Sequence, residues 1–263
     1  MKNCVSINRD KCIGCKKCVI DCPLNAIAMK DNKATMILDE CMECGHCVAI
    51  CPQAAITMKG YQMSEVKDFR PETFTIDSEV FLNTIKFRRS IRQYKNQEIE
   101  RAKIQSIIEV GRFTPTGSNK QKIRYVVAEK PAEIEKDAIK IFKKIKIVTD
   151  FLASFIKLPI DTRRYNVQEG FFFHHANKVI LVISKDETDA ALASTNMGTM
   201  AESLGLGVLY VGYFSQAAKF SRAIKKKLKI KGKEKVVTAI ALGYPRVKYQ
   251  RTVPRKQATI NYI

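Results

Sequence analysis

The apolar residues between positions 123 and 245 fall into short, nearly continuous runs that predict β-strands. These runs are rich in Val, Ile, Leu and Tyr, the residue types that favour pleated, half-buried backbone. They are IRYVVAE at 123–129, KVILVIS at 178–184, GVLYVGYF at 207–214 and KVVTAIALGYP at 235–245. Helical patterns separate them, so this part of the chain is predicted to pack helices against a sheet.

Apolar residues at helical spacing predict the helices. Val80, Phe81 and Ile85 mark one segment, and a second helix is expected from an Asn96 cap to a C-terminal stop at Gly111. A third helix is predicted from Asp189 to Leu204, ended by Gly205. Its apolar face is expected to pack in the core through Ala190, Ala193, Met197, Met200, Ala201 and Leu204.

The first sixty residues show a different pattern, an internal duplication. CIGCKKCVIDCP at 12–23 recurs as CMECGHCVAICP at 41–52, an offset of 41 − 12 = 29 residues. Residues 61–76 show neither duplication nor clear periodicity, and Pro71 is expected to interrupt any helix there. The sequence therefore predicts a small domain at 1–62, a linker at 63–76 and a larger domain at 77–263.

Eight of the nine cysteines lie in the duplicated runs, with the spacing C-x2-C-x2-C-x3-C-P. Three thiolates separated by two residues each suit three corners of an iron–sulfur cubane, and the cysteine before the proline ligates the other cluster. The first [4Fe-4S] centre is thus assigned to Cys12, Cys15, Cys18 and Cys51, and the second to Cys41, Cys44, Cys47 and Cys22. Structural zinc and a disulfide framework are the alternatives, but zinc sites favour two separated ligand pairs.

Two other residues near these runs are not assigned as ligands. Cys4 stands outside both runs and is expected to be a spare thiol, and His46 is expected to face solvent. Over about residues 1–60 the motif resembles the bacterial two-cluster ferredoxins. That resemblance implies an α+β fold of two pseudo-symmetric halves that transfers one electron at a time.

Composition and charge exclude several classes of protein. The chain has 263 residues, 46% of them hydrophobic, and a formal charge of +20. Residues 1–66 hold eight Lys and Arg against seven Asp and Glu, 8 − 7 = +1, so the remaining +19 belongs to the later part. No run of eighteen apolar residues and no apolar signal core occurs, so a cytoplasmic protein without a membrane partner is expected. No nucleic-acid recognition motif accompanies the charge, so no nucleic-acid partner is expected.

An arginine cluster at 88–92 suggests an anionic ligand. Arg88, Arg89, Ser90 and Arg92 present guanidinium and hydroxyl groups of the kind that bind phosphate, although solvated surface explains many such runs. PTGSNKQ at 115–121, then NMGTMAESLGLG and LGYPRVKYQRTVPR follow along the chain. In this order the segments resemble the FMN-dependent nitroreductase family over roughly residues 75–263, which implies an α+β domain.

The resemblance implies a set of FMN contacts. Arg88, Arg89, Ser90 and Arg92 would contact the phosphate, ribityl chain and pyrimidine edge, and Arg251 or Arg255 would complete the phosphate site. The partner subunit of a homodimer would supply Pro115, Thr116, Gly117, Ser118 and Asn119, with Asn119 bonding the ring system. Backbone at Val211, Gly212 and Tyr213 would approach the N5 edge, unless Gly212 is a strand bulge. The chain departs from the family at Gln121, Lys122 and Ile123, where Gln-Pro-Trp is common, so the contacts of Gln121 are not assigned.

Together the two resemblances imply a nitroreductase-type oxidoreductase. Electrons from a low-potential donor, either a separate ferredoxin or NAD(P)H, would pass through two clusters to FMN and reduce a small acceptor such as a nitroaromatic or a quinone. Phe151, Phe155 and Tyr165 either roof the flavin or pack in the core.

Three points stay open in the sequence. No catalytic proton donor is identified, and His174 and His175 are expected to be structural. The lysines of segment 224–235 either dock an acidic ferredoxin or form a solvated surface. The alternative function is that of an electron-transfer or flavin-storage protein that turns over no small molecule.

Overall fold

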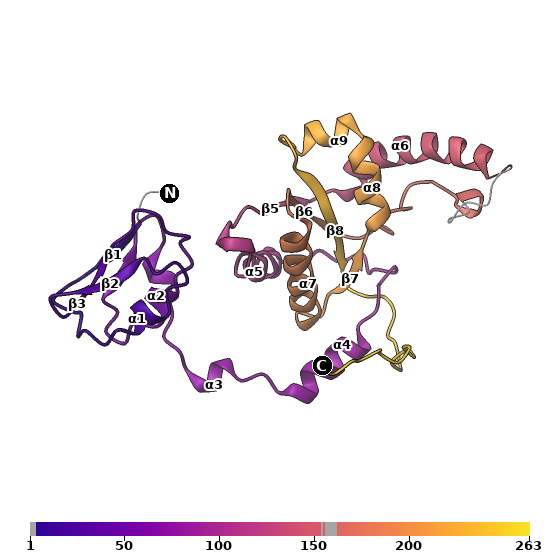
Figure 1. Ribbon diagram of the computed structural model, residues 1–263. Helices are drawn as coiled ribbons and strands as arrows, with labels where there is room; N and C mark the ends of the chain where they lie inside the picture. Colours follow the sequence, from indigo (N-terminus) through magenta and orange to yellow (C-terminus); the bar gives the residue numbers. More distant parts are fainter. Residues whose placement is uncertain (1–3, 154, 156–161) are drawn as a thin grey trace. The chain divides into compact units, whose positions relative to one another are not determined.

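The computed structural model describes residues 4–153, 155 and 162–263 (Figure 1). The chain forms two compact units, described separately below. Unit 1 comprises Met1–Thr75 together with Thr116–Lys120, and unit 2 comprises Ile76–Pro115 together with Gln121–Ile263. A short loop from the later part of the sequence therefore belongs with the cysteine-bearing unit.

Unit 1 contains two short antiparallel strand pairs and two one-turn helices. Strand β1 (Val5–Ile7) pairs with β4 (Ile56–Met58), and β2 (Ile27–Lys30) pairs with β3 (Lys33–Met36). Helix α1 (Lys17–Ile20) lies 29 residues before α2 (His46–Ala49), 46 − 17 = 29, which is the offset of the sequence duplication. The two halves therefore repeat in structure as they do in sequence.

The core of unit 1 is small and made partly of sulfur. Its buried members are Val5, Cys18, Ile27, Ala34, Ile56 and Met58, and six further cysteines pack against them. A segment of this length buries little apolar surface, so bound metal is expected to contribute to its folding.

Unit 2 is built on a four-stranded antiparallel sheet in the order β5-β6-β8-β7. The strands are β5 (Arg124–Ala128), β6 (Lys178–Ser184), β8 (Lys235–Gly243) and β7 (Gly207–Tyr210). Every residue of β6 is buried. Its continuous apolar run reflects a central strand that is covered on both faces.

Helices cover the two faces of this sheet and bury separate cores. One face packs α5 (Arg101–Arg112) and α7 (Glu187–Ser203) against Ile180 and Val182 of β6. The other face packs α6 (Pro131–Leu152), α8 (Gly212–Phe220) and α9 (Arg222–Lys227) against Val179, Leu181 and Ile183 (Figure 1). Successive residues of a strand point to opposite faces, so β6 contributes to both cores. The mixed helix and strand content confirms the α+β class.

Several predicted boundaries are wrong. The run GVLYVGYF is strand only to Tyr210, and α8 begins at Gly212, so Gly212 opens a helix and is not a strand bulge. Helix α5 begins after Glu100 and not at an Asn96 cap. Gly111 lies inside α5, where an added Cβ would come within 2.8 Å of Met197 Sδ, so close packing explains this glycine.

The segment between the cysteine motifs and the sheet holds short helices. The 3-10 turn η1 (Met63–Glu65) is followed by α3 (Pro71–Phe74) and α4 (Ser78–Phe87). Pro71 stands at the first position of α3, where a missing N–H costs nothing, so it starts a helix and does not interrupt one. The Asp77 side chain caps α4, which buries none of its residues.

The remaining elements are the 3-10 turns η2 (Gly117–Asn119) and η3 (Thr162–Arg164). Among the described helices, none is both long enough and apolar enough to cross a membrane.

Candidate cofactor sites

Two cavities in unit 1 are each ringed by four cysteines. The first is bordered by Cys12, Cys15, Cys18 and Cys51, and the second by Cys22, Cys41, Cys44 and Cys47. The structure therefore brings together the same two sets of four that crossed ligation predicts, with one thiol of each set contributed by the other motif. Within the described ranges no three metal-binding side chains are close enough to hold a single ion. Rings of four thiols around a cavity suit a polynuclear centre better than one ion.

The backbone of both cysteine loops is shaped to present N–H groups inward. Each loop has two left-handed residues, Gly14 (φ 70°) and Lys16 (φ 63°) in the first, Glu43 (φ 56°) and Gly45 (φ 75°) in the second. In turns that contain left-handed residues, successive N–H groups can form a concave nest that attracts negative charge. A cluster held by four thiolates is anionic, so both loops fit it.

Backbone N–H groups also donate directly to cysteine sulfurs. Four such bonds, from residues 26, 34, 43 and 55 to the Sγ atoms of Cys22, Cys12, Cys41 and Cys51, have lengths of 3.3, 3.4, 3.3 and 3.3 Å. The two N–H groups of Ala34 and Gly14 lower the pKa of the Cys12 thiol. These donors stabilise thiolates, the form in which cysteine binds iron.

Burial acts in the opposite direction on two other thiols. It raises the pKa of Cys47 to about 11, and it raises that of Cys18 as well. Both thiols are therefore protonated at neutral pH until a metal displaces the proton. Burial, followed by the charge of Glu43, also raises the pKa of Cys4, which packs beside the core and lines neither cavity. His46 is exposed, as expected.

Unit 2 contains a larger cavity of about 600 Å³ at the end of β7 and the start of α8. Of the predicted flavin contacts it brings together Arg92, Val211, Gly212 and Tyr213. A Cβ added to Gly212 would meet nothing within 4 Å, so a planar ligand has room to approach this backbone. The N–H of Val211 is already bonded to Ala239 O at 2.8 Å, which leaves the first N–H groups of α8 as the better donors.

Sequence reasoning missed part of the wall of this cavity, namely Phe171, His174, Leu209, Tyr210 and Gln216. Gln216 lies one helical turn after Gly212 and hence on the same face of α8, a relation that a strand at 207–214 does not predict. Tyr165, for which the sequence allows either roofing of the flavin or core packing, also lines the cavity.

A buried carboxylate shapes the turn that carries His174. Glu135 of α6 is 2% exposed and accepts hydrogen bonds from the N–H groups of Gly170, Phe172 and Phe173 at 3.0, 2.8 and 3.0 Å. His174 follows with a left-handed φ of 50°. Burial, and then the nearby charge of Arg92, lowers the pKa of His174, so the imidazole is neutral at pH 7.

A second arginine of the cluster, Arg88, lies beside this cavity through Tyr210. The guanidinium of Arg88 lies 4.8 Å from the centre of the Tyr210 ring, and its Nε is 3.5 Å from Glu202 Oε1. Burial raises the pKa of Glu202 to about 6, and Arg88 opposes that rise. Ser90 forms a parallel bridge with Val208 of β7, which fixes the cluster against the sheet.

Three buried guanidinium nitrogens of this cluster indicate that an anion such as phosphate fits here. Within the described part of the chain, Arg88 Nη2, Arg89 Nε and Arg89 Nη2 are buried and have no hydrogen-bond partner. Buried guanidinium donors are costly unless they are paired. A phosphate would supply the missing acceptors in the bidentate geometry that arginine favours, so these residues fit the phosphate of FMN.

Other predicted flavin residues do not line this cavity in the single chain. Arg251 and Arg255 are exposed in the C-terminal segment. Pro115 belongs to unit 2, whereas Thr116, Gly117, Ser118 and Asn119 belong to unit 1. There the Asn119 side chain donates to the carbonyl oxygens of Met42 and Glu43, at 3.2 and 2.7 Å.

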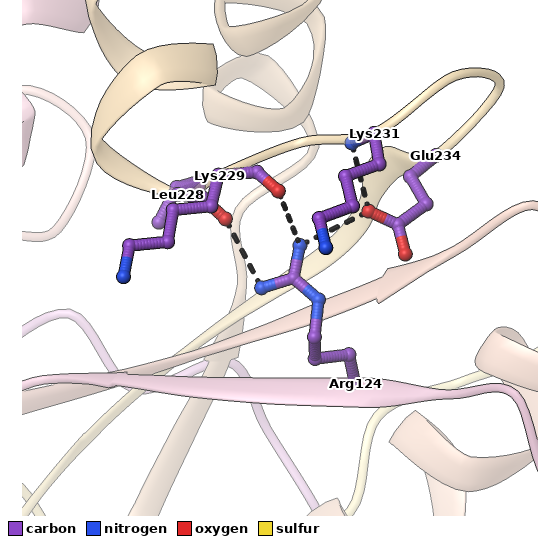
Figure 2. Close-up of polar contacts among 5 residues, drawn as sticks. All are labelled: Arg124, Leu228, Lys229, Lys231 and Glu234. Carbon is purple, nitrogen blue, oxygen red and sulfur yellow. Dashed lines mark hydrogen bonds and ion pairs between the residues drawn. The ribbon is translucent and has the colours of Figure 1, made fainter.

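The lysine-rich segment 224–235 is tied to the sheet by one arginine, as Figure 2 shows. Arg124 of β5 donates to Leu228 O at 3.0 Å and to Lys229 O at 3.3 Å, and it pairs with Glu234 at 3.1 Å. Glu234 also accepts from the Lys231 N–H at 3.0 Å. The segment is therefore ordered, and it exposes the side chains of Lys225, Lys226, Lys227, Lys229, Lys231 and Lys233.

Comparisons with known proteins identify a known family in each part of the chain. Residues 85–244 match the model of the nitroreductase family, and residues 5–58 match that of the 4Fe-4S dicluster domain. No curated protein matches the chain.

Solved structures resemble unit 2 at low sequence identity. A nitroreductase with bound FMN from Bacteroides fragilis NCTC 9343 is 23% identical, with a TM-score of 0.53 over 69% of this chain and 98% of that one. An FMN-dependent nitroreductase from Clostridium difficile R20291 is 17% identical, with a TM-score of 0.53 over 68% and 98%. A BluB-like flavoprotein from Clostridium difficile 630 is 19% identical, with a TM-score of 0.56 over 69% and 99%. The fold of unit 2 is shared with these proteins. Because the nitroreductase model matches more than half of the chain, the chain belongs to the nitroreductase family, and a 4Fe-4S dicluster domain precedes the nitroreductase match.

Proposed function

We propose that the protein passes electrons from a low-potential donor through two [4Fe-4S] clusters to FMN and reduces a small acceptor such as a nitroaromatic or a quinone. The observation that carries this proposal is the presence, in one chain, of two cavities ringed by four thiols and a 600 Å³ cavity beside unpaired arginine donors. When bound, the clusters supply single electrons, and FMN collects two for delivery to the acceptor.

Each part of the arginine cluster has a distinct role in this proposal. Arg88 and Arg89 hold the phosphate with their unpaired nitrogens, and the Ser90 hydroxyl adds a donor. Arg92 borders the cavity together with Gly212, where open space admits the edge of the flavin. Glu202 balances the charge of Arg88 and keeps its side chain in place.

The aromatic wall of the cavity favours a planar acceptor. The Tyr165 ring lies 5.9 Å from that of Phe171 and 6.0 Å from that of Tyr213, centre to centre. The hydroxyls of Tyr165 and Tyr213 are 3.2 Å apart, so one donates to the other. Such a wall offers stacking faces to an aromatic ring and a hydroxyl to its polar substituent.

A homodimer is part of the proposal. The partner would supply the loop from Pro115 to Asn119 and Arg251 or Arg255 to the flavin. Helix α4 supports a second copy, because it exposes Val80, Phe81, Leu82, Ile85 and Phe87 and buries none of its residues. Exposed apolar side chains on one helix are typical of an interface. Light scattering of anoxically purified protein is expected to give a mass of about twice the 29.8 kDa chain, and a monomer would contradict this part.

The central experiment uses full-length protein purified and reconstituted without oxygen. Iron analysis is expected to give about eight atoms per chain, since each centre holds four, and flavin analysis about one FMN. Reduced ferredoxin, and separately NAD(P)H, is then mixed with protein, and flavin bleaching and nitroaromatic consumption are followed. Arg89→Ala is expected to retain iron but to bind FMN at least 10-fold more weakly, because charged hydrogen bonds to phosphate are lost.

Two results would contradict the proposal. Flavin that is reduced by ferredoxin at the same rate after Cys15→Ser and Cys44→Ser would remove the clusters from the electron path. Rapid FMN reduction without consumption of any acceptor would instead favour the electron-transfer or flavin-storage alternative.

A further inference from the structure

One amide side chain holds the loop between the first two cysteines of the second motif. Asn119 Nδ2 donates to Met42 O at 3.2 Å and to Glu43 O at 2.7 Å. An amide nitrogen carries two hydrogens, so a single group satisfies two consecutive carbonyls. All these residues belong to unit 1.

The position of these carbonyls fixes the direction of the neighbouring N–H groups. In a planar trans peptide the C=O and the N–H point in opposite directions. When Asn119 holds Met42 O on one side, the Glu43 N–H points to the other, where it donates to Cys41 Sγ at 3.3 Å. Holding Glu43 O directs the Cys44 N–H in the same way. Asn119 thus keeps the nest of the second loop turned toward its thiols.

The first loop is supported differently, by its own half of unit 1. Gly14 is the counterpart of Glu43, since 14 + 29 = 43, and a Cβ there would lie 2.4 Å from Asn32 O in the β2–β3 turn. Lys33, at the start of β3, donates to Cys12 O at 2.5 Å. In the second half β4 is followed by η1 and not by a hairpin, so the second loop is not supported by a hairpin turn.

The second loop also has a conformation that needs support. Glu43 takes a left-handed φ of 56°, where Gly14 takes 70° in the first loop. A residue with a Cβ is disfavoured in this region, whereas glycine is not. The Glu43 side chain accepts from Tyr61 OH at 2.8 Å, and its carbonyl accepts from Asn119. These bonds hold a strained residue that would otherwise relax by turning its peptides.

We propose that Asn119 is a positioning residue of the second iron–sulfur site, a role in addition to the flavin contact that the family resemblance implies for it. The inference rests on the proposed second cluster at Cys22, Cys41, Cys44 and Cys47. Residue 119 lies within the nitroreductase match at 85–244 and outside the dicluster match at 5–58. Retention of the second cluster therefore depends on a residue of the flavoprotein segment.

The test compares iron release from full-length variants reconstituted without oxygen. Asn119→Ala removes the clamp, and Asn119→Asp keeps its shape but replaces the donating NH2 by oxygen, so both are expected to lose the second cluster faster. Partners of metal ligands typically contribute 10- to 100-fold in affinity, so about half of the iron is expected to reach a chelator roughly 10-fold faster than in the wild type. Lys33→Ala is the matched control. It removes the bond to Cys12 O and is expected to accelerate iron release from the first cluster.

Spectroscopy identifies which cluster is lost. Reduced protein with two adjacent clusters gives a spin-coupled paramagnetic resonance signal, and Cys44→Ser provides the reference for a protein without an intact second site. Asn119→Asp protein that has lost about half of its iron is expected to give the same spectrum as Cys44→Ser. Iron release at the wild-type rate from both Asn119 variants would overturn the inference, and loss of FMN with unchanged iron release would assign Asn119 to the flavin instead. A wild-type protein that binds only about four iron atoms would overturn the second cluster itself, and with it the proposed function.

Discussion

Replacing Glu135 by glutamine tests how the cavity wall is held in place. The carboxylate is 2% exposed and accepts three backbone hydrogen bonds, from Gly170 to Oε2 and from Phe172 and Phe173 to Oε1. Hydrogen bonds to a charged group contribute about 1.5–3 kcal/mol each. Glutamine keeps one acceptor oxygen for Phe172 and Phe173 but places an NH2 group against the Gly170 N–H.

Two opposing terms set the size of the effect. Loss of the Gly170 bond, the unpaired N–H and the weaker remaining bonds cost about 3–5 kcal/mol, whereas burying a neutral amide in place of a carboxylate returns about 1–2 kcal/mol. Glu135→Gln is therefore expected to lower the free energy of unfolding of unit 2 by about 2–3 kcal/mol. The turn that carries Phe171 and His174 should loosen with it, so FMN should also bind more weakly.

The assay is urea unfolding of flavin-free protein at pH 7, followed by FMN titration at low urea. Glu133→Gln, at an exposed position on the same helix, is the control and should stay within about 0.5 kcal/mol of the wild type. A change of less than about 0.5 kcal/mol in Glu135→Gln would refute the argument, because the three bonds would then contribute no more than solvent does.

Three further predictions concern the cysteines, a glycine and a carboxylate. The double variant Cys15→Ser/Cys51→Ser is expected to retain about four iron atoms, because crossed ligation places both thiols on one cluster; loss of all iron would show uncrossed ligation. Gly111→Ala is expected to destabilise unit 2 by about 1–2 kcal/mol in urea unfolding, because a Cβ at 2.8 Å from Met197 Sδ outweighs the gain of about 1 kcal/mol in helix propensity; a stabilised variant would contradict this. Glu202 has a pKa of about 6, above its usual 4.5, so the folded state holds the extra proton between these values and loses stability as pH rises through them. Glu202→Gln should remove this loss of stability, which is about 1 kcal/mol after allowing for solvent screening. The free energy of unfolding is measured for wild type and variant at pH 4.5 and pH 7. An equal change between the two pH values in both proteins would contradict the prediction.

The sequence was sufficient where the determinants are local. The spacing of the cysteines predicts the same two sets of four that the structure brings together, because three thiols of each set lie in one short loop and the duplicated motif identifies the fourth. The strand KVILVIS and the core face of α7 were also predicted, since their periodicity reflects burial that the structure confirms. Short apolar runs were less informative. GVLYVGYF changes from strand to helix at Gly212 without any change in hydrophobicity.

Contacts between distant segments could not be predicted. The pair of Arg88 with Glu202 joins residues that are 202 − 88 = 114 positions apart, and nothing in the pattern of α7 marks Glu202 as the partner. The acceptors of Asn119 are backbone carbonyls, which every residue has. The same holds for Glu135, whose three donors are backbone N–H groups of a turn that the sequence did not reveal.

The alternation of β6 between two cores has a consequence for the way unit 2 opens. Val179, Leu181 and Ile183 belong to one core and Ile180 and Val182 to the other, and all five are fully buried. Neither layer of helices can detach completely without exposing one side of this strand to water. The amide protons of residues 179–183 should therefore exchange with deuterium only in the rarest, global openings, and they should do so together.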